Sequence, residues 1–204
     1  MSDIKKTLEA LDNKGFKAVF AKDAPEALSY VLSQISKQES VGVGGSVTLA
    51  ETGITEALIE RGNTVYSGSL AQKNGQDAYA ARKAGMSADV YISSTNAVTL
   101  EGDLINIDGI GNRAAAMFYG PDKVIIVAGR NKITTNPNTA IARIKKEACP
   151  KNAVRLGLDT PCAKTGKCED CGSPQRMCNV VVRIQYPPRG KEIHVVMIDA
   201  DFGY

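Results

Sequence analysis

The chain has 204 residues, 43% of them hydrophobic, and a formal net charge of +3 with acids and bases interspersed. A chain of this length buries roughly 70% of its unfolded surface, so we expect a single domain over residues 1–204. The charge pattern argues against a nucleic-acid-binding protein. No apolar run approaches the roughly 20 residues that span a bilayer, and the first residues do not resemble a signal peptide. We therefore expect a cytoplasmic protein that binds neither nucleic acid nor membrane.

Patterns typical of helices and strands alternate along the first half of the chain. Apolar residues at helical spacing are followed by short apolar runs, and Gly, Pro, Ser and Asp mark the boundaries. In chain order, the predicted elements are helix 3–14, strand 16–21, helix 25–35, strand 40–43, helix 47–60, strand 64–67, helix 76–84 and strand 88–93.

The second half continues this alternation and then departs from it. The predicted elements are a hairpin of strands 97–100 and 103–107, helix 112–119, strand 123–128, helix 138–148, and strands 180–185 and 192–198. Alternating strands and helices predict an α/β fold with a largely parallel sheet and helices on both faces. Such sheets bind ligands beyond the carboxyl ends of their strands.

The first candidate site is a glycine turn between a strand and a helix. It contains Gly42, Gly44, Gly45, Ser46 and Thr48. Glycines allow the backbone to approach an anion closely, and free N–H groups at a helix start favour phosphate or carboxylate. The turn has neither the Walker nor the dinucleotide-binding spacing. A plain tight connection is the alternative interpretation.

The second candidate site follows later strands of the same sheet. Its members are hydrogen-bonding side chains and glycines that expose backbone N–H groups, namely Asn96, Gly109, Gly111, Asn112 and Arg113. Arg113 supplies a fixed cationic fork that suits an anion. The alternative is a hairpin with two glycine turns, in which Asp108 or Asn112 caps the next helix and Arg113 is solvated. Lys132 belongs to a third candidate, residues 129–132 after strand 123–128, for which the alternative is a solvated basic turn.

Few residues are candidates for catalysis. The carboxylates of Glu101 and Asp108, together with Arg113, are the groups near the expected site that could move a proton or hold a charge. His194 is the only histidine and lies in an apolar strand, which favours a packing role. A Ser-His-Asp triad or a histidine metal site is therefore not expected.

Four of the five cysteines gather near the C-terminus. Cys162, Cys168, Cys171 and Cys178 follow the pattern C-x5-C-x2-C-x6-C, within a polar, Gly- and Pro-containing segment, 160–179. Such a segment buries too little apolar surface to order itself, and cytosolic thiols stay reduced. We expect the four thiolates to bind one metal centre. A [4Fe-4S] iron–sulfur cluster is favoured, Zn²⁺ is the next alternative, and a redox-active C-x2-C pair is the third. Cys149 is expected to be a small core residue.

These motifs together resemble the LUD-domain family, named for lactate utilisation. The resemblance covers essentially the whole chain and is specific only as a combination, which comprises residues 42–46, 94–97, 102–113, 127–132 and the cysteine segment. It implies the NagB-like α/β fold shared by glucosamine-6-phosphate deaminase, ribose-5-phosphate isomerase and CoA-transferases. In those relatives the first glycine turn binds phosphate, and this turn corresponds to Gly42 to Thr48.

The chemistry of those relatives does not carry over residue by residue. The stretch from Asp108 to Arg113 differs from the catalytic segment of the isomerase. Nothing in the sequence promotes Glu51 or Glu101 to the glutamate nucleophile of a CoA-transferase. Some LUD proteins take part in oxidising L-lactate to pyruvate beside iron–sulfur partners.

The expected function is an accessory subunit or component of lactate-type hydroxy-acid oxidation, with a small anionic ligand and electrons passing through the cluster. A non-redox isomerase, transferase or lyase acting on a phosphorylated or CoA-linked substrate is the first alternative, with a structural metal. A non-catalytic ligand-binding protein is the second. Iron–sulfur proteins and further copies of the chain are the candidate protein partners.

Overall fold

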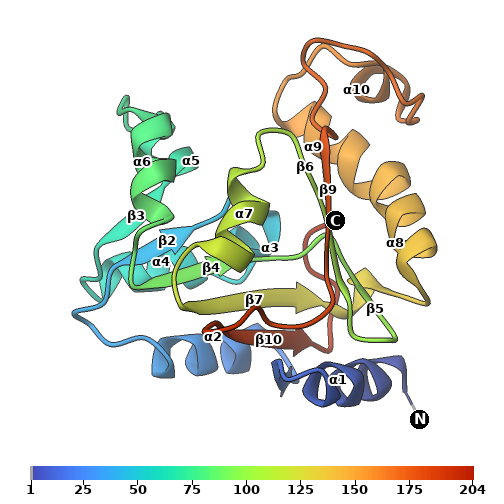
Figure 1. The fold of residues 1–204 in the computed structure, drawn as a ribbon. Coiled ribbons are helices and arrows are strands. Elements are labelled where there is room, and N and C mark those ends of the chain that lie inside the picture. Colours follow the sequence, from blue (N-terminus) through green and yellow to red (C-terminus); the bar gives the residue numbers. More distant parts are fainter. Residues whose placement is uncertain (1) are drawn as a thin grey trace.

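A six-stranded parallel sheet forms the centre of the protein (Figure 1), seen here as a computed structural model that describes residues 2–204. In spatial order its strands are β1 (Lys17–Ala21), β10 (Glu192–Ile198), β7 (Lys123–Gly129), β4 (Val90–Ser93), β2 (Val41–Val43) and β3 (Val65–Ser67). All neighbouring pairs are parallel, so the carboxyl ends of the strands lie at one edge of the sheet. The predicted α/β fold with a parallel sheet is confirmed.

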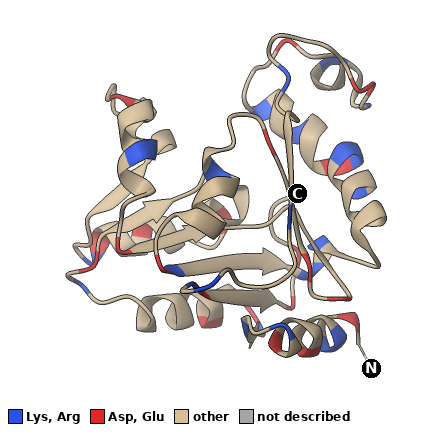
Figure 2. Cartoon of the chain, in the orientation of Figure 1, with Lys and Arg blue, Asp and Glu red and all other residues tan. Residues whose placement is uncertain are grey.

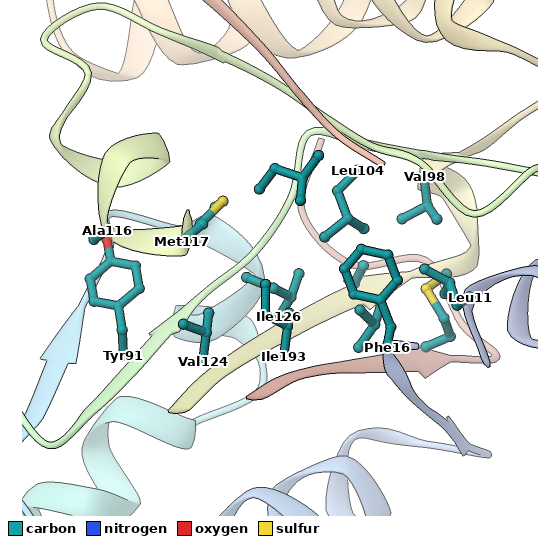
Figure 3. Close-up of a cluster of buried hydrophobic side chains, with 14 residues drawn as sticks. Leu11, Phe16, Tyr91, Val98, Leu104, Ala116, Met117, Val124, Ile126 and Ile193 are labelled. Carbon is teal, nitrogen blue, oxygen red and sulfur yellow. The ribbon is translucent and has the colours of Figure 1, made fainter. Parts of the chain in front are cut away.

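Helices cover both faces of this sheet, because its central strands are apolar on both sides. Along β7, Val124 and Ile126 belong to one buried cluster, whereas Ile125 and Val127 belong to the other. The helices on the Ile125 side are α2 (Ala24–Ser33), α3 (Val47–Glu51) and α4 (Ile54–Glu60). On the other side lie α1 (Asp3–Asn13) and α7 (Asn112–Tyr119). Figure 3 shows that cluster, with Phe16 and Leu11 beside Leu104.

A second, four-stranded sheet packs on the α1 side of the first. Its order is β8 (Ile133–Thr134), β5 (Ala97–Thr99), β6 (Leu104–Asp108) and β9 (Val180–Ile184). Val98 and Leu104 face the main sheet, whereas Ala97 and Ile105 face a long helical segment. That segment consists of α8 (Pro137–Arg143), a π-helical turn (Ile144–Ala148) and α9 (Cys149–Arg155). The hairpin predicted over 97–107 is confirmed as the antiparallel pair β5–β6.

A buried carboxylate ties the second sheet to its surroundings. Asp103, in the β5–β6 turn, is fully buried and forms ion pairs of 2.6 Å with Lys14, which follows α1, and with Arg183 of β9. A buried charge is tolerated where it is paired and hydrogen-bonded. The turn beside it also needs a glycine, because Gly102 has φ +80° and lies against the backbone of Ala10.

Several predicted boundaries were wrong. The stretch 47–60, expected to be mostly helical, is so, but Gly53, which has φ +67°, divides it into α3 and α4. The helix expected to end at residue 148 continues to Arg155, because the π-helical turn before Pro150 accommodates the missing N–H of that proline. The sequence pattern missed β8 and three short or irregular helical pieces, which are α5 (Gly68–Lys73), α10 (Pro161–Thr165) and the 3₁₀ turn Arg130–Lys132. Helix α6 (Ala78–Gly85) was expected.

Charged residues of both signs are interspersed over these elements, as Figure 2 shows. Within residues 2–204, none of the helices combines the length and apolar character that crossing a membrane requires.

Candidate functional site

The carboxyl ends of the neighbouring strands β2, β4 and β7 bring the predicted site residues together. Gly44 follows β2, Ser94 follows β4, and Lys132 follows β7. A Cβ atom on Gly44 would lie 2.6 Å from Ser93 Oγ and 3.0 Å from Arg113 Cγ. The glycine turn and the start of α7 are therefore in contact, and only glycine fits at position 44. Gly45, by contrast, is exposed and has no atom within 4 Å of a built Cβ, so the turn is open at this residue.

Lys132 occupies the centre of this edge. Its side chain is buried, with 3% of the residue exposed. Its Nζ atom lies 2.7 Å from Thr48 Oγ1 and 2.9 Å from Ser94 Oγ. Within residues 2–204, no carboxylate forms an ion pair with Lys132.

The surroundings of Lys132 disfavour its charged form. Burial is the main cause that lowers its pKa from 10.5 to about 7, and the positive charges of Arg143 and Arg113 add to the effect. The negative charge of Glu51 acts in the opposite direction. A buried lysine whose pKa is lowered in this way differs sharply from a solvated one. The interpretation of Lys132 as a solvated basic side chain is therefore wrong.

The Nη groups of Arg113 donate hydrogen bonds to other groups of the protein. Its two Nη atoms donate to Ser94 O, Asn106 Oδ1, Asn96 Oδ1 and Ile107 O at 2.7–3.1 Å. Burial lowers its pKa, and Asp108, 3.7 Å from its Nε, opposes that shift. The guanidinium thus fixes the geometry of the edge and contributes positive charge, while its Nη groups are already bonded to protein acceptors.

The remaining polar candidates mostly build the framework. Asp108 accepts hydrogen bonds from the backbone N–H groups of Ile110, Gly111 and Ala114, so it anchors the start of α7. Asn96 Oδ1 accepts from Ile107 N as well as from Arg113. Gly111 precedes Asn112, the first residue of α7, with φ +90°.

Four candidates have roles away from Lys132. Gly42 abuts the backbone of Gly85 and lets α6 approach the sheet. Glu101 is exposed in the β5–β6 turn, at the opposite end of β5 from Asn96, so the structure does not bring it to this edge. Gly109 packs against Met177, since a Cβ there would lie 3.0 Å from Met177 Cα. Ser46 caps α3 by accepting a hydrogen bond from Leu49 N.

The segment 199–204, which sequence reasoning did not connect with the site, covers Lys132. Gly203 donates to Glu51 Oε2 at 2.6 Å and accepts from Asn131 Nδ2 at 3.1 Å. A Cβ on Gly203, which has φ +63°, would lie 2.5 Å from Thr48 Oγ1 and 3.2 Å from Lys132 Nζ. In the local sequence, the glycine at position 203 is the only sign that the backbone there approaches Thr48 and Lys132 so closely.

His194 lies in the middle of β10 and is almost fully buried. Its ring nitrogens are 2.7 Å from Tyr30 OH and 2.6 Å from Glu192 Oε1. Burial is the main cause that lowers its pKa. These contacts suit a packed, hydrogen-bonded histidine, and the independence of any catalysis from His194 stays a prediction.

The cysteine segment is more ordered than its composition suggested. Thr160 caps α10, and Arg176 donates to the carbonyls of Cys171 and Cys178 at 2.6 and 3.2 Å and to Asp170 at 2.7 Å. Lys145 of the π-helical turn also pairs with Asp170, at 3.2 Å. Hydrogen bonds donated by Arg176 therefore hold the segment. The sequence pattern did not predict this role of Arg176.

Three thiols of this segment, those of Cys162, Cys168 and Cys178, are near enough to Cys149 at the start of α9 to affect its pKa. Burial raises the pKa of Cys149 to about 12, and the charges of Cys178, Cys168 and Cys162 raise it further. A cleft of about 1020 Å³ separates the helical segment from the cysteines, and Cys162, Cys168 and Lys145 line it. Soft thiol donors suit iron–sulfur or zinc. Within residues 2–204, however, no three His, Cys, Asp or Glu side chains are gathered closely enough to hold a metal ion, so the arrangement as it stands does not fit such a centre.

Comparison with known proteins places this architecture in a family. The LUD-domain signature matches residues 4–198. The crystal structure of a DUF162 family protein from Deinococcus radiodurans is similar over 97% of this chain and 99% of that chain, with 13% identity and a TM-score of 0.55. No match to a curated protein is found. At this identity the structural similarity concerns the fold, whereas the signature covers nearly the whole sequence. The chain belongs to the LUD-domain family.

Proposed function

We propose that the edge around Lys132 binds a small anion, a carboxylate or a phosphate. The observation that carries the proposal is a group of three basic side chains, with Lys132 buried and Arg113 and Arg143 partly buried, that has too few carboxylate partners. Lys132 and Arg143 each lack a carboxylate within ion-pair distance among residues 2–204, and Arg113 has only Asp108 at 3.7 Å. Buried charges are normally paired, so an anion is the natural complement of this edge. The open turn at Gly45 and the hydroxyls of Thr48 and Ser94 add neutral donors and acceptors.

The test is a thermal-shift comparison of the full chain with lactate, pyruvate, inorganic phosphate and acetyl-CoA. A ligand present at a hundred times its dissociation constant stabilises the folded state by about 3 kcal/mol, which is readily measured. We expect stabilisation by one chemical class and its loss in Lys132→Met. The matched control is Lys191→Met, because Lys191 is partly buried and its amine is already bonded to Gly120 O and Asp122. Equal shifts in both variants would contradict the proposal.

We also propose a thiolate-bound metal centre in the segment 160–179, with an iron–sulfur cluster favoured over Zn²⁺. Support comes from the donor set, since four half-buried free thiols lie in one segment. Because the sulfurs are not gathered as they stand, binding requires the segment to close, and the adjacent cleft leaves room for that movement. An absorption spectrum of anaerobically purified protein distinguishes the outcomes: broad visible absorption bleached by dithionite supports the cluster, and a colourless zinc-containing protein supports zinc.

The two sites together support a role as a component of lactate-type hydroxy-acid oxidation, with iron–sulfur proteins as partners. The supporting observation is a backbone hydrogen bond between the end of the cysteine segment and the end of β6. Asn179, which follows Cys178, donates through its backbone to Asp108 O, and Asp108 anchors the helix that carries Arg113. The non-redox alternative has one observation in its favour, which is the uncompensated amine of Lys132.

A further inference from the structure

Each of the two hydroxyls that contact Lys132 has a backbone carbonyl within reach to accept its proton. Thr48 Oγ1 donates its single proton to Phe202 O at 3.3 Å, and Ser94 Oγ donates to Thr95 O at 3.3 Å. A hydroxyl has one proton and two lone pairs. Both hydroxyls therefore present only lone pairs to Lys132, and the amine is the donor in both of its contacts.

Two acceptors match the two N–H groups of a neutral amine. An ammonium ion would carry a third N–H, for which residues 2–204 provide no carboxylate partner. In the neutral form the remaining tetrahedral position on nitrogen holds the lone pair. Lysines elsewhere in the chain differ, since Lys14 and Lys191 each contact a carboxylate, at 2.6 and 2.8 Å.

The position of this amine suits chemistry. It lies beyond the carboxyl ends of three neighbouring parallel strands, where sheets of this kind hold substrates. The pKa of about 7 for Lys132 agrees with a substantial neutral fraction at physiological pH. A desolvated lysine next to other cations is a recognised carbonyl nucleophile.

We propose that Lys132 is a carbonyl-reactive amine, which forms an imine with a small oxo acid held at this edge. The inference rests on the proposed anion site and deepens it, because it names the class of ligand. An oxo acid supplies both features that the edge calls for: a carbonyl carbon for the neutral amine of Lys132, and a carboxylate for the positive charges of Arg113 and Arg143.

The step needs no oxidant or reductant. The lone pair of Nζ attacks the carbonyl carbon, a C–N bond forms, and a proton passes from nitrogen to the former carbonyl oxygen. The C–O bond then breaks, and the oxygen leaves as water with the second amine proton after a proton shift. The products are one imine and one water molecule. Gly203 lies directly over the amine, so entry of the oxo acid requires the segment 199–204 to shift.

The experiment is reductive trapping. The full chain is incubated with pyruvate and sodium cyanoborohydride near neutral pH, followed by intact-mass measurement and peptide mapping. We expect one carboxyethyl group, at Lys132, with at least about tenfold more adduct there than at any other lysine, because ordinary lysines are almost wholly protonated at this pH. The adduct should be lost in Lys132→Arg and retained in Lys191→Arg. Ser94→Ala, which keeps the lysine, should reduce trapping several-fold.

Peptide mapping of the trapped wild-type chain tests whether Lys132 forms the imine, even if a variant does not fold. Adduct spread evenly over exposed lysines would overturn the inference. Calorimetric binding of pyruvate without an adduct at Lys132 would overturn the imine and leave the anion site standing. The absence of binding by any anion, together with the absence of an adduct, would overturn both.

Discussion

Lys132 and Thr48 are 84 residues apart in the sequence, yet their side chains meet at 2.7 Å. The contact joins the end of β7 to the first turn of α3, and Ser94 at the end of β4 completes it. Two hydroxyl–amine contacts of Lys132 therefore link the three strand ends that form the candidate site.

Replacing Thr48 by valine tests this contact. Valine keeps the shape but removes an acceptor of Lys132, so we expect weaker anion binding by several-fold and a loss of about 1–2 kcal/mol in the free energy of unfolding. Thr52→Val is the control, because Thr52 Oγ1 bonds only to the backbone oxygens of Thr48 and Leu49. Urea unfolding and titration calorimetry of both variants measure the two effects. Comparable weakening of binding in the control would show that the Thr48 hydroxyl has no special role.

The pH dependence of stability should carry the signature of Lys132. Burial and the charges of Arg143 and Arg113 lower its folded pKa to about 7 against the opposing charge of Glu51, whereas the unfolded value stays near 10.5. Between these values the unfolded state binds more protons, so stability contributed by this site rises from pH 7 towards pH 10. We expect a rise of a few kcal/mol for the wild type relative to Lys132→Met. Parallel stability curves for the two proteins across this range would refute the lowered pKa.

The hydrogen bonds that Arg113 donates predict that lysine cannot replace it. A lysine cannot reach Ser94 O, Asn106 and Asn96 together, so several buried acceptors would lose their donors. We expect Arg113→Lys to lower the free energy of unfolding by about 2–4 kcal/mol. Arg130→Lys serves as the comparison, since its pairs with Asp199 and Asp201 are exposed and solvent-screened, so this change should have little effect on stability. Chemical denaturation of both variants checks the difference.

Gly203→Ala should loosen the cover over Lys132. Alanine adds both strain at φ +63° and a clash with Thr48 Oγ1. Gly190→Ala separates the two causes, because Gly190 has φ +77° but no neighbour within 4 Å. We expect faster hydrogen exchange over 199–204 in the first variant only. Unchanged exchange in both variants would mean that Gly203 does not hold the segment in place.

The proposed metal centre predicts that Cys168, in the cysteine segment, is needed for metal binding, whereas Cys149, outside it, is not. Cys168→Ser should lose most of the metal bound by anaerobically purified protein, whereas Cys149→Ser should keep it, because the raised pKa of Cys149 disfavours its thiolate. Elemental analysis measures the bound metal. Full metal content in Cys168→Ser would remove the proposed centre.

The strands and the meeting of the glycine turn with Arg113 could be predicted, because the carboxyl ends of parallel strands share one edge. The central role of Lys132 could not. A lysine in a turn after a strand gives no local sign of burial, which here depends on Thr48, Ser94 and Gly203 from distant parts of the chain. Continuation of the helix past Pro150 was equally hidden, since a π-helical turn is decided by packing and not by composition.

Titration calorimetry near pH 7, in buffers that differ in ionisation enthalpy, tests the central claim most directly. An anion bound beside Lys132 raises the pKa of the amine, so binding of lactate, pyruvate or phosphate should take up a fraction of a proton from the buffer. We predict binding with proton uptake in the wild type, and loss of both in Lys132→Met but not in Lys191→Met. Binding without proton uptake, or of equal strength in Lys132→Met, would contradict the assignment of this edge as an anion site centred on Lys132.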